Sequence, residues 1–479
     1  GELMPLILPG NVATALGGAY EVANSCRFNN DDSAYMTKTY GSVGNQKTFT
    51  ISLWTKRSEL STIIPSGQNF ISYYYSSTTA RSDLGWSDDD RIIIGLNPTG
   101  SSWAYYYSTG KFRDPSAWYH ICIAFDTTQG TDSNRLKLWV NNRQETITGG
   151  YPAENLDTGY NANGYVHQIG KYASGDAAYL DGYLAEFVVL DGTATTPSSF
   201  GEYDEDSPTI WKPIDVSGLT FGTNGFYLDF EDSGDLDDDE SGNTNDFTAT
   251  NLAATDQATD TPTNNFATWN SVMPALSNTS FSEGNLTFAS NGSASGQLAA
   301  ISTMAASTGK WYAEFKMTDE STQAGSYPYI GTVGTSLFAS TYIGASGLDG
   351  VGFNSNEAVY SNGSEIDSGV TNIAAGNIVG VAADFTNKKI YFHVNGTYIN
   401  SGDPAAGSNG YTIPTTAESF YSFMCSVYGA SGTWEANFGS PSFSISSGNA
   451  DGNGYGNFEY AVPSGYLALC TKNLGSDGG

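Results

Sequence analysis

Short runs in which apolar and polar residues alternate recur along most of the chain, separated by Gly, Asn, Asp and Ser. Phe49, Ile51 and Leu53 alternate with polar neighbours, so in an extended strand they share one face. Residues 135–140 alternate in the same way and stop at Asn141-Asn142, a turn dipeptide. No long run has the 3.6-residue period of an amphipathic helix. The pattern therefore predicts antiparallel β-strands and argues against βαβ units.

The same texture returns from residue 271 onward. Residues 311–317 alternate, and residues 389–394 end at Asn395-Gly396, a typical hairpin turn. In each half an apolar strand ends in an aspartate, Asp126 or Asp384, and a second strand follows that ends in an Asn turn. This internal echo predicts two antiparallel sandwiches of related architecture.

Between the two halves the pattern weakens. Prolines fall closer together, apolar runs shorten, and eight of the twelve residues 229–240 are acidic. We expect four parts: an extended N-terminal arm over residues 1–24, a sandwich over 25–200, a Pro-rich and acidic linker over 201–270, and a second sandwich over 271–479. The apolar arm is either a docking or oligomerising segment or a frayed terminus.

Composition narrows the function classes. The chain has 50 acidic and 19 basic residues and a formal net charge of -31, which argues against binding a nucleic-acid backbone or an anionic membrane. No stretch of 18 apolar residues is present, so we expect no membrane span. The four cysteines are far apart in sequence and form no CxxC pair, which argues against a zinc ribbon or a redox motif. Few charges and many Ser, Thr, Asn, Gly and Tyr residues suit a rigid extracellular β module.

Two aromatic clusters are the candidate contact sites. Residues 73–75 read Tyr-Tyr-Tyr and residues 103–107 read Trp-Ala-Tyr-Tyr-Tyr. Alternate residues of a strand face opposite sides, so some of these rings must face outward. Outward rings stack on sugars or form subunit contacts, whereas the structural alternative is that they cover sandwich edges. The six candidates for glycan or subunit contact are Tyr73, Tyr75, Trp86, Trp103, Tyr105 and Tyr107.

The acidic run contains a candidate calcium site, the one cofactor that the residues suggest. Asp235, Asp237, Asp239 and Asp246 occupy the first, third, fifth and twelfth positions of an EF-hand-like count. Glu240 stands at the sixth position, where such a loop needs glycine. A solvated linker of mutually repelling charges is the alternative.

The first half resembles laminin G-like domains. Residues 118–126, beginning Trp-Tyr-His, and residues 136–142, ending Trp-Val-Asn-Asn, look like the core strand pair of that family. Residues 49–54 resemble its early Phe-Thr strand, and residues 183–187 resemble its late strand with Glu-Phe. The likeness covers residues 20–200 and implies a concanavalin A-like sandwich.

The second half resembles SPRY-like domains. Residues 309–315, reading Gly-Lys-Trp-Tyr-Ala-Glu-Phe, look like the opening strand of that family. Residues 349–353 and 376–384 look like its later strands, and residues 389–396 look like its hairpin ending in Asn-Gly. The likeness covers residues 275–445. Taken together, we predict an all-β protein of two antiparallel β-sandwiches, concanavalin A-like or jelly-roll, joined by an acidic linker.

The pairing of these halves, with the segments 222–230 and 463–471, resembles structural proteins of tailed bacteriophages, especially marine ones. The resemblance implies a non-enzymatic virion protein, as a fibre, an appendage or a capsid decoration, displayed on the outside of the particle. Its implied partners are other virion proteins, further copies of the chain and a host-surface polysaccharide. Two alternatives stay open: a purely structural decoration or assembly protein, and a polysaccharide depolymerase.

The depolymerase alternative needs two carboxylates facing each other across a cleft. The nearest match to a Glu-x-Asp-x-Glu strand is Glu202-Tyr203-Asp204-Glu205-Asp206, which ends in Asp and lies beside prolines. His120 and His393 are expected to be packed sheet histidines, and His167, which lies between strands, indicates no role. The turn at residues 88–90 is another candidate for an ion or a glycan, but a plain turn is the simpler interpretation. We therefore predict no catalytic residues.

Overall fold

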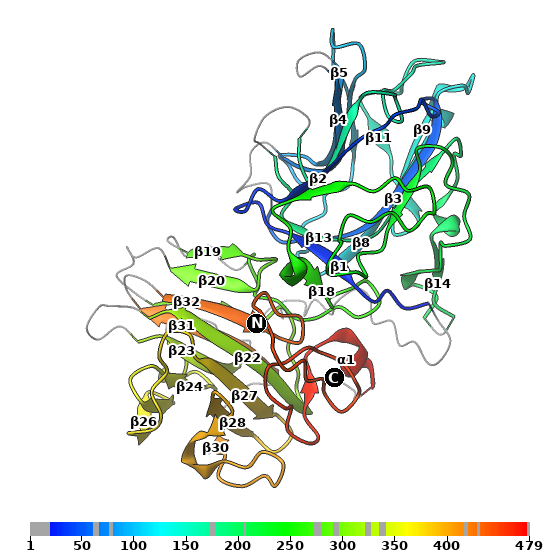
Figure 1. Ribbon diagram of the computed structural model, residues 1–479. Coiled ribbons are helices and arrows are strands. Elements are labelled where there is room, and N and C mark those ends of the chain that lie inside the picture. Colours follow the sequence, from blue (N-terminus) through cyan, green and yellow to red (C-terminus); the bar gives the residue numbers. More distant parts are fainter. Residues whose placement is uncertain are drawn as a thin grey trace. The chain divides into compact units, whose positions relative to one another are not determined.

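The computed structural model describes residues 20–60, 67–75, 80–172, 178–205, 207–272, 279–290, 297–320, 327–334, 342–415, 420–428 and 432–476. The chain divides into two compact units, one ending at Thr263 and the other beginning at Asn264 (Figure 1). Regular structure is almost entirely β-strand, and nearly all strand pairs are antiparallel, which confirms the predicted fold class. In the described part, none of the helical segments has the length and apolar character needed to traverse a bilayer.

The first unit consists of two large sheets and one small one. Sheet 1 contains, in spatial order, β10 (Arg143–Gln144), β9 (Leu136–Val140), β8 (Trp118–Asp126), β3 (Thr48–Arg57), β13 (Gly182–Asp191), β1 (Ser25–Phe28) and β18 (Gln257–Ala258), with β16 (Phe226–Leu228) beside β13. Sheet 2 contains β11 (Ile147–Thr148), β7 (Ala104–Ser108), β6 (Ile92–Asn97), β5 (Ala80–Trp86), β4 (Gln68–Tyr75), β12 (Val166–Ile169), β2 (Tyr35–Thr39) and β17 (Thr248–Thr250). The small sheet pairs β14 (Gly201–Tyr203) with β15 (Trp211–Pro213).

The main core of the first unit lies between sheets 1 and 2. Phe49, Ile51 and Leu53 of β3 are buried in it, as their alternation predicts, and Ile94 and Tyr106 enter it from sheet 2. Removing this apolar surface from water is the main force that holds the two sheets together.

A second apolar layer covers the opposite face of sheet 1. Phe200, Val216 and Phe221 pack on Val188 and Leu190 of β13. Sheet 1 is thus buried on both faces. Every residue of β13 and nine of the ten residues of β3 are accordingly buried, although the sequence of β3 alternates.

Residues 201–263 make up much of this cover and differ from the linker that the sequence predicts. They belong to the first unit, and their strands pair with it: β16 with β13, β17 with β2 and β18 with β1. Phe226, Leu228, Leu236 and Phe247 are buried in the main core. The sequence did not predict this packing, because the apolar residues in the acidic run are too sparse to form a periodic pattern.

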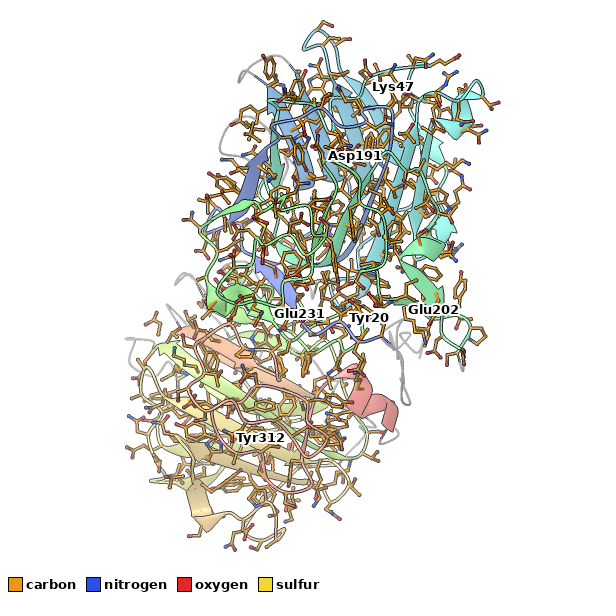
Figure 2. All side chains as sticks on the ribbon, turned by 45° about the vertical axis from the view of Figure 1, so that its right-hand side comes forward. Tyr20, Lys47, Asp191, Glu202, Glu231 and Tyr312 are labelled. Carbon is orange, nitrogen blue, oxygen red and sulfur yellow. The ribbon has the colours of Figure 1, made fainter. Side chains whose placement is uncertain are left out.

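The predicted N-terminal arm is described only from Tyr20 onward; residues 1–19 lie outside the described part. The Tyr20 hydroxyl donates to Glu186 Oε2 at 3.0 Å, and the Val22 N–H donates to Thr263 Oγ1 at 3.1 Å. Residues 20–24 therefore run along the covered side of sheet 1. Tyr20 is labelled in Figure 2.

The second unit repeats the two-sheet plan. Sheet 3 contains β19 (Thr279–Ser282), β20 (Thr287–Ser290), β32 (Gly432–Asn437), β22 (Lys310–Asp319), β27 (Ile378–Asp384), β28 (Lys389–Val394) and β29 (Thr397–Tyr398), with β30 (Tyr411–Thr412) beside β28 and β33 (Leu467–Ala468) parallel to β22. Sheet 4 contains β21 (Gln297–Ile301), β31 (Tyr421–Tyr428), β23 (Tyr329–Gly334), β24 (Val351–Asn354), β25 (Ala358–Ser361) and β26 (Ser364–Ser368). The short helix α1 (Thr471–Ser476) follows.

Sheet 3 is also covered by the chain that follows it. Tyr312 of β22, labelled in Figure 2, packs with Phe458 and Tyr466. The buried Glu314 carboxylate accepts the N–H groups of Glu459 and Tyr460 at 2.9 and 2.8 Å. Each unit therefore has one sheet whose outer face is closed by a later segment of its own chain.

Candidate functional site

The outer face of sheet 2 carries the candidate site, on strands β5, β6 and β7. Strand register places Asp83, Gly95 and Tyr105 side by side on this face. Leu84 and Tyr106, the next residues of β5 and β7, point the other way into the core. The alternation of a strand thus sends every second residue of β7 outward.

Three outward rings form a row along β7 and the residue before it, hereafter called the aromatic row: Trp103, Tyr105 and Tyr107. The ring centroids of Trp103 and Tyr105 are 5.1 Å apart with an interplanar angle of 8°. Those of Tyr105 and Tyr107 are 6.3 Å apart at 29°. Rings this close and this nearly parallel are stacked on one another, so they present edges to solvent more than faces.

An arginine lies over the ring at each end of the aromatic row. The Arg81 guanidinium is 5.7 Å from the Trp103 ring centroid, and that of Arg91 is 4.4 Å from the Tyr107 centroid. Such cation–π contacts hold the end rings in place. The row is therefore a preorganised series of side chains rather than three independent ones.

The polar atoms of the aromatic row have no hydrogen-bond partner in the described part of the chain. This applies to Trp103 Nε1 and to the hydroxyls of Tyr105 and Tyr107. Tyr105 is 38% exposed, and burial together with the nearby Asp83 raises its pKa to about 12, so its phenol stays protonated at neutral pH. Three groups able to donate a hydrogen bond are thus available on one strand.

Asp83 lies beside Tyr105 and is half-buried. Burial raises the pKa of its carboxyl to about 6. Gly95 lies between them: a Cβ atom there would be 2.9 Å from Tyr105 Cε1 and 3.1 Å from Asp83 Cβ. The absence of a side chain at residue 95 therefore lets the Tyr105 ring lean across the sheet toward Asp83.

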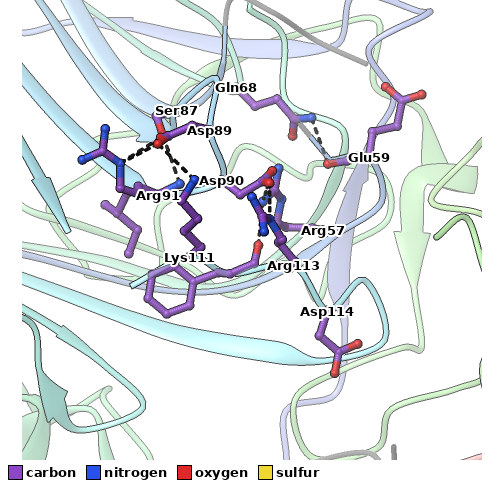
Figure 3. Close-up of polar contacts among 12 residues, drawn as sticks. Arg57, Glu59, Gln68, Ser87, Asp89, Asp90, Arg91, Lys111, Arg113 and Asp114 are labelled. Carbon is purple, nitrogen blue, oxygen red and sulfur yellow. Dashed lines mark hydrogen bonds and ion pairs between the residues drawn. The ribbon is translucent and has the colours of Figure 1, made fainter. Parts of the chain in front are cut away.

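Arg91, which lies over the Tyr107 ring, belongs to a cluster of ion pairs that Figure 3 shows. Asp89 binds Arg91 Nε at 2.8 Å and Lys111 Nζ at 3.3 Å. Burial acts in the other direction, but the hydrogen bonds from Arg91 and Ser87 lower the pKa of Asp89 to about 2. Arg91 thus connects the cluster to the Tyr107 ring.

The next aspartate completes this cluster. Asp90 binds Arg57 Nη1 at 3.2 Å and Arg113 Nε at 2.6 Å. The carboxylates of Asp89 and Asp90 are therefore engaged with cations, which disfavours the ion-binding interpretation of the turn at residues 88–90.

The other aromatic candidates fall elsewhere. Tyr73 and Trp86 are 0% and 1% exposed and belong to the main core, so the structure rules them out as surface contacts. The sequence misplaced them because the register that decides which face is buried is set by neighbouring strands. Tyr75 is 46% exposed and stacks on Tyr165, with centroids 4.7 Å apart, away from the row.

The candidate calcium residues are not assembled as a site. Both carboxylate oxygens of Asp239 accept hydrogen bonds from the protein, including the N–H groups of Tyr227 and Asn245. Asp237 accepts the Ala249 N–H at 2.8 Å, and Asp246 accepts the N–H of Asp239 at 3.3 Å. Asp235 takes part in the turn through its backbone: its N–H donates to the Asp232 carbonyl at 3.1 Å, and its carbonyl accepts the Asp238 N–H at 3.4 Å.

These aspartates thus hold loops in place instead. Over the described ranges, no group of three or more His, Cys, Asp or Glu side chains is placed to hold a metal ion. The EF-hand-like spacing fails because this segment folds as a series of turns that direct its carboxylates at backbone N–H groups.

The candidate catalytic carboxylates are held by one lysine. Lys212 Nζ lies 3.5 Å from Glu202 Oε1 and 3.4 Å from Asp204 Oδ2. Asp206 lies outside the described residues. A glycosidase needs two carboxylates that face each other across a cleft. Here both carboxylates contact the same lysine instead, so this pair does not have that arrangement.

The histidines are packed. Trp211 Nε1 donates to His120 Nδ1 at 2.9 Å, so Nε2 carries the proton and donates to Ser52 Oγ at 2.8 Å. Burial lowers the pKa of His120 to about 3. His167 and His393 are also buried, and the same cause lowers the pKa of each to about 4.

The sequence analysis did not single out Glu186, an acid that the structure buries. Glu186 interrupts the apolar strand β13 at a bulge and has φ of 49°. Its carboxyl contacts the hydroxyls of Tyr20 and Tyr227 at 3.0 to 3.1 Å, and burial raises its pKa to about 8. The lone charge within an apolar run was the available signal.

Known proteins support the architecture of the first unit. Residues 29–198 match the model of the concanavalin A-like lectin/glucanases superfamily. No curated protein matches the sequence. The match agrees with the sequence resemblance of the first half to laminin G-like domains and with its concanavalin A-like sandwich.

Solved structures give weaker likenesses. The chain is similar to the SPRY domain of human HERC1 at 13% identity, covering 32% of this chain and 87% of that one, with a TM-score of 0.26. A putative carbohydrate binding protein from Bacteroides ovatus shows 15% identity, coverage of 48% and 59%, and a TM-score of 0.32. Domains LG4-5 of the mouse laminin alpha1 chain show 9% identity, coverage of 85% and 84%, and a TM-score of 0.29. None of these matches is to a virion protein.

Proposed function

We propose that this chain is a non-enzymatic glycan-binding protein whose contact surface is the aromatic row on sheet 2. The observation that carries the proposal is a set of three hydrogen-bonding groups, on Trp103, Tyr105 and Tyr107, that are held at strand spacing and meet no partner among the described residues. Hydroxyl-rich ligands are recognised by such convergent polar groups on aromatic surfaces. The match of residues 29–198 to the concanavalin A-like lectin/glucanases superfamily supports carbohydrate recognition.

The geometry also defines the mode of contact. Because the rings of the aromatic row stack on one another, a sugar would meet ring edges and hydroxyls rather than open ring faces. Asp83 and Arg81, which flank Tyr105 and Trp103, supply a further acceptor and donors.

The test is binding to a panel of immobilised polysaccharides: laminarin, xylan, arabinogalactan, agarose, dextran, alginate and polygalacturonate. We expect at least one to bind, and the double variant Trp103→Ala/Tyr105→Ala to lose about tenfold or more in affinity. Tyr75→Ala is the matched control, since Tyr75 is exposed in the same unit but lies away from the row. Absence of binding to the whole panel, or equal binding by the double variant, would overturn the proposal.

The non-enzymatic part of the proposal is supported by the lysine that engages both Glu202 and Asp204. Long incubation with the polysaccharide that binds should release no new reducing ends. Release of reducing ends that stops in Glu202→Gln would instead establish a depolymerase.

We also propose that the protein is displayed on the outside of a tailed bacteriophage particle, together with other virion proteins and further copies of itself. This finer assignment rests on the sequence resemblance of the paired domains and of segments 222–230 and 463–471. Antibodies against the chain, with gold labels, should decorate intact purified particles in electron micrographs. Labelling restricted to lysed-cell debris would contradict it.

A further inference from the structure

The aromatic row has the form of a track rather than a pocket. Its three rings follow one strand at centroid separations of 5.1 and 6.3 Å, close to the side-chain repeat along one face of a β-strand. One pyranose ring in an extended glycan has a length of the same order. Each ring of the row therefore lies within reach of a successive sugar.

The ring at each end of the row is capped by an arginine side chain. Arg81 and Arg91 lie over the rings of Trp103 and Tyr107 at 5.7 and 4.4 Å. A site that recognises the end of a glycan must stop the chain, whereas a row of side chains along a strand is compatible with a glycan that continues past both ends.

The charges around the row balance locally. Around the row and the adjoining ion-pair cluster, five cations are matched by five carboxylates: Arg57, Arg81, Arg91, Lys111 and Arg113 by Asp83, Asp88, Asp89, Asp90 and Glu145. The whole chain carries -31, so a polyanion is repelled at long range without a local excess of cations to attract it.

We infer that the ligand is an extended, neutral polysaccharide bound through an internal stretch of about three sugars that lies along β7, one for each ring. The inference rests on the proposed function and names the ligand class of the same site. Affinity then comes from hydrogen bonds that successive sugars make with Trp103 Nε1 and the hydroxyls of Tyr105 and Tyr107.

The test uses a size ladder prepared by partial hydrolysis of the panel polysaccharide that binds best, titrated against the full-length chain by calorimetry. The affinity of the protein should rise about tenfold or more from the monosaccharide to the trisaccharide and then level off for longer oligosaccharides. Chemical reduction of the reducing end should leave the affinity of the longer oligomers unchanged. Alginate and polygalacturonate should bind at least about tenfold more weakly than the best neutral polymer.

Alanine variants that remove one ring of the aromatic row at a time test whether the glycan binds along it. Trp103→Ala or Tyr107→Ala removes one end of it, so the affinity should level off at a shorter oligomer. Tyr105→Ala removes the middle and should weaken every oligomer, while Tyr75→Ala should change none.

The outcomes separate the two proposals. A monosaccharide that binds as tightly as the longer oligomers, a loss of affinity on end reduction, or a preference for polyanions would overturn the track and leave glycan binding in place. Failure of the entire panel to bind would remove the proposed function itself.

Discussion

The two outer faces of the first sandwich differ, although both belong to antiparallel sheets of similar size. The outer face of sheet 1 is buried beneath Phe200, at the end of the predicted first sandwich, and beneath Trp211 and Phe221 from the region predicted as a linker. The outer face of sheet 2 at strand β7 keeps Tyr105 38% exposed. One face therefore contributes to stability, and the other leaves its side chains available for recognition.

Polar residues behave differently on the two faces. On sheet 1, Lys56 is buried and binds Asp260 Oδ2 at 2.7 Å, and Trp118 Nε1 donates to Asp260 Oδ1 at 2.9 Å. On sheet 2, the hydroxyls of Tyr105 and Tyr107 have no protein partner in the described part of the chain. A covered polar group must be paired, because an unpaired one costs free energy, whereas an uncovered group is satisfied by water until a ligand replaces it.

Removal of the Asp260 carboxylate should therefore have the largest effect. Asp260→Ala leaves the buried Lys56 ammonium without this partner and should lower the free energy of unfolding of the first unit by about 3–5 kcal/mol. Urea denaturation followed by tryptophan fluorescence measures it. Asp88→Ala, at an exposed position, is the control and should change stability by less than about 0.5 kcal/mol. Equal stability of both variants would show that the cover does not depend on this pair.

A rise in pH should lower the free energy of unfolding by an intermediate amount, through Glu186 on the covered face of sheet 1. The pKa of Glu186 is raised from 4.5 to about 8 by burial, so the folded state binds its proton more tightly than the unfolded chain. Its contribution to stability is then fully present below pH 4.5 and is lost as pH rises toward 8. The slope reaches at most about 1.4 kcal/mol per pH unit.

Glu186→Gln tests this prediction, since the amide keeps a hydrogen-bonding partner for Tyr20 and Tyr227 but does not titrate. Urea denaturation between pH 5 and 9 should show a stability difference between variant and wild type that grows in favour of the variant with pH. Parallel curves would mean that another group controls the pH dependence.

A small change on the uncovered face should affect binding more than stability. In Gly95→Ala the new Cβ would be 2.9 Å from Tyr105 Cε1, so the ring must move. We expect the free energy of unfolding to change by less than about 1 kcal/mol and the affinity for the best neutral polysaccharide to fall about tenfold. Gly130→Ala, where a Cβ meets nothing within 4 Å, is the control. A larger loss of stability than of affinity would contradict the division between the two faces.

Periodicity predicted correctly which residues of β3 face the main core. Phe49, Ile51 and Leu53 are buried as expected. It failed for the intervening residues of β3, which are polar yet buried. Thr50 Oγ1 donates to the Thr193 carbonyl and Ser52 pairs with His120, so these side chains are satisfied under the cover. A polar residue in the sequence does not distinguish contact with water from contact with a later segment of the chain.

The candidate site was predicted in part. The outward rings Trp103, Tyr105 and Tyr107 were among the six candidates, but so were the buried Tyr73 and Trp86. Arg81, Asp83 and Gly95 were missed. Arg81 and Asp83 alternate with inward residues of β5, which was the available signal, but their proximity to Tyr105 depends on the register of β5, β6 and β7.

The sequence by itself determined the strand content, the presence of two sandwiches with related strand patterns, and the net charge that disfavours anionic partners. These properties follow from composition and from the two-residue period of a strand, which act over a few residues. Only the tertiary structure decided that residues 201–263 cover sheet 1 and that the row of β7 stays uncovered. Such choices depend on contacts between segments far apart in the chain, where a shift of one residue in register exchanges the buried face for the exposed one.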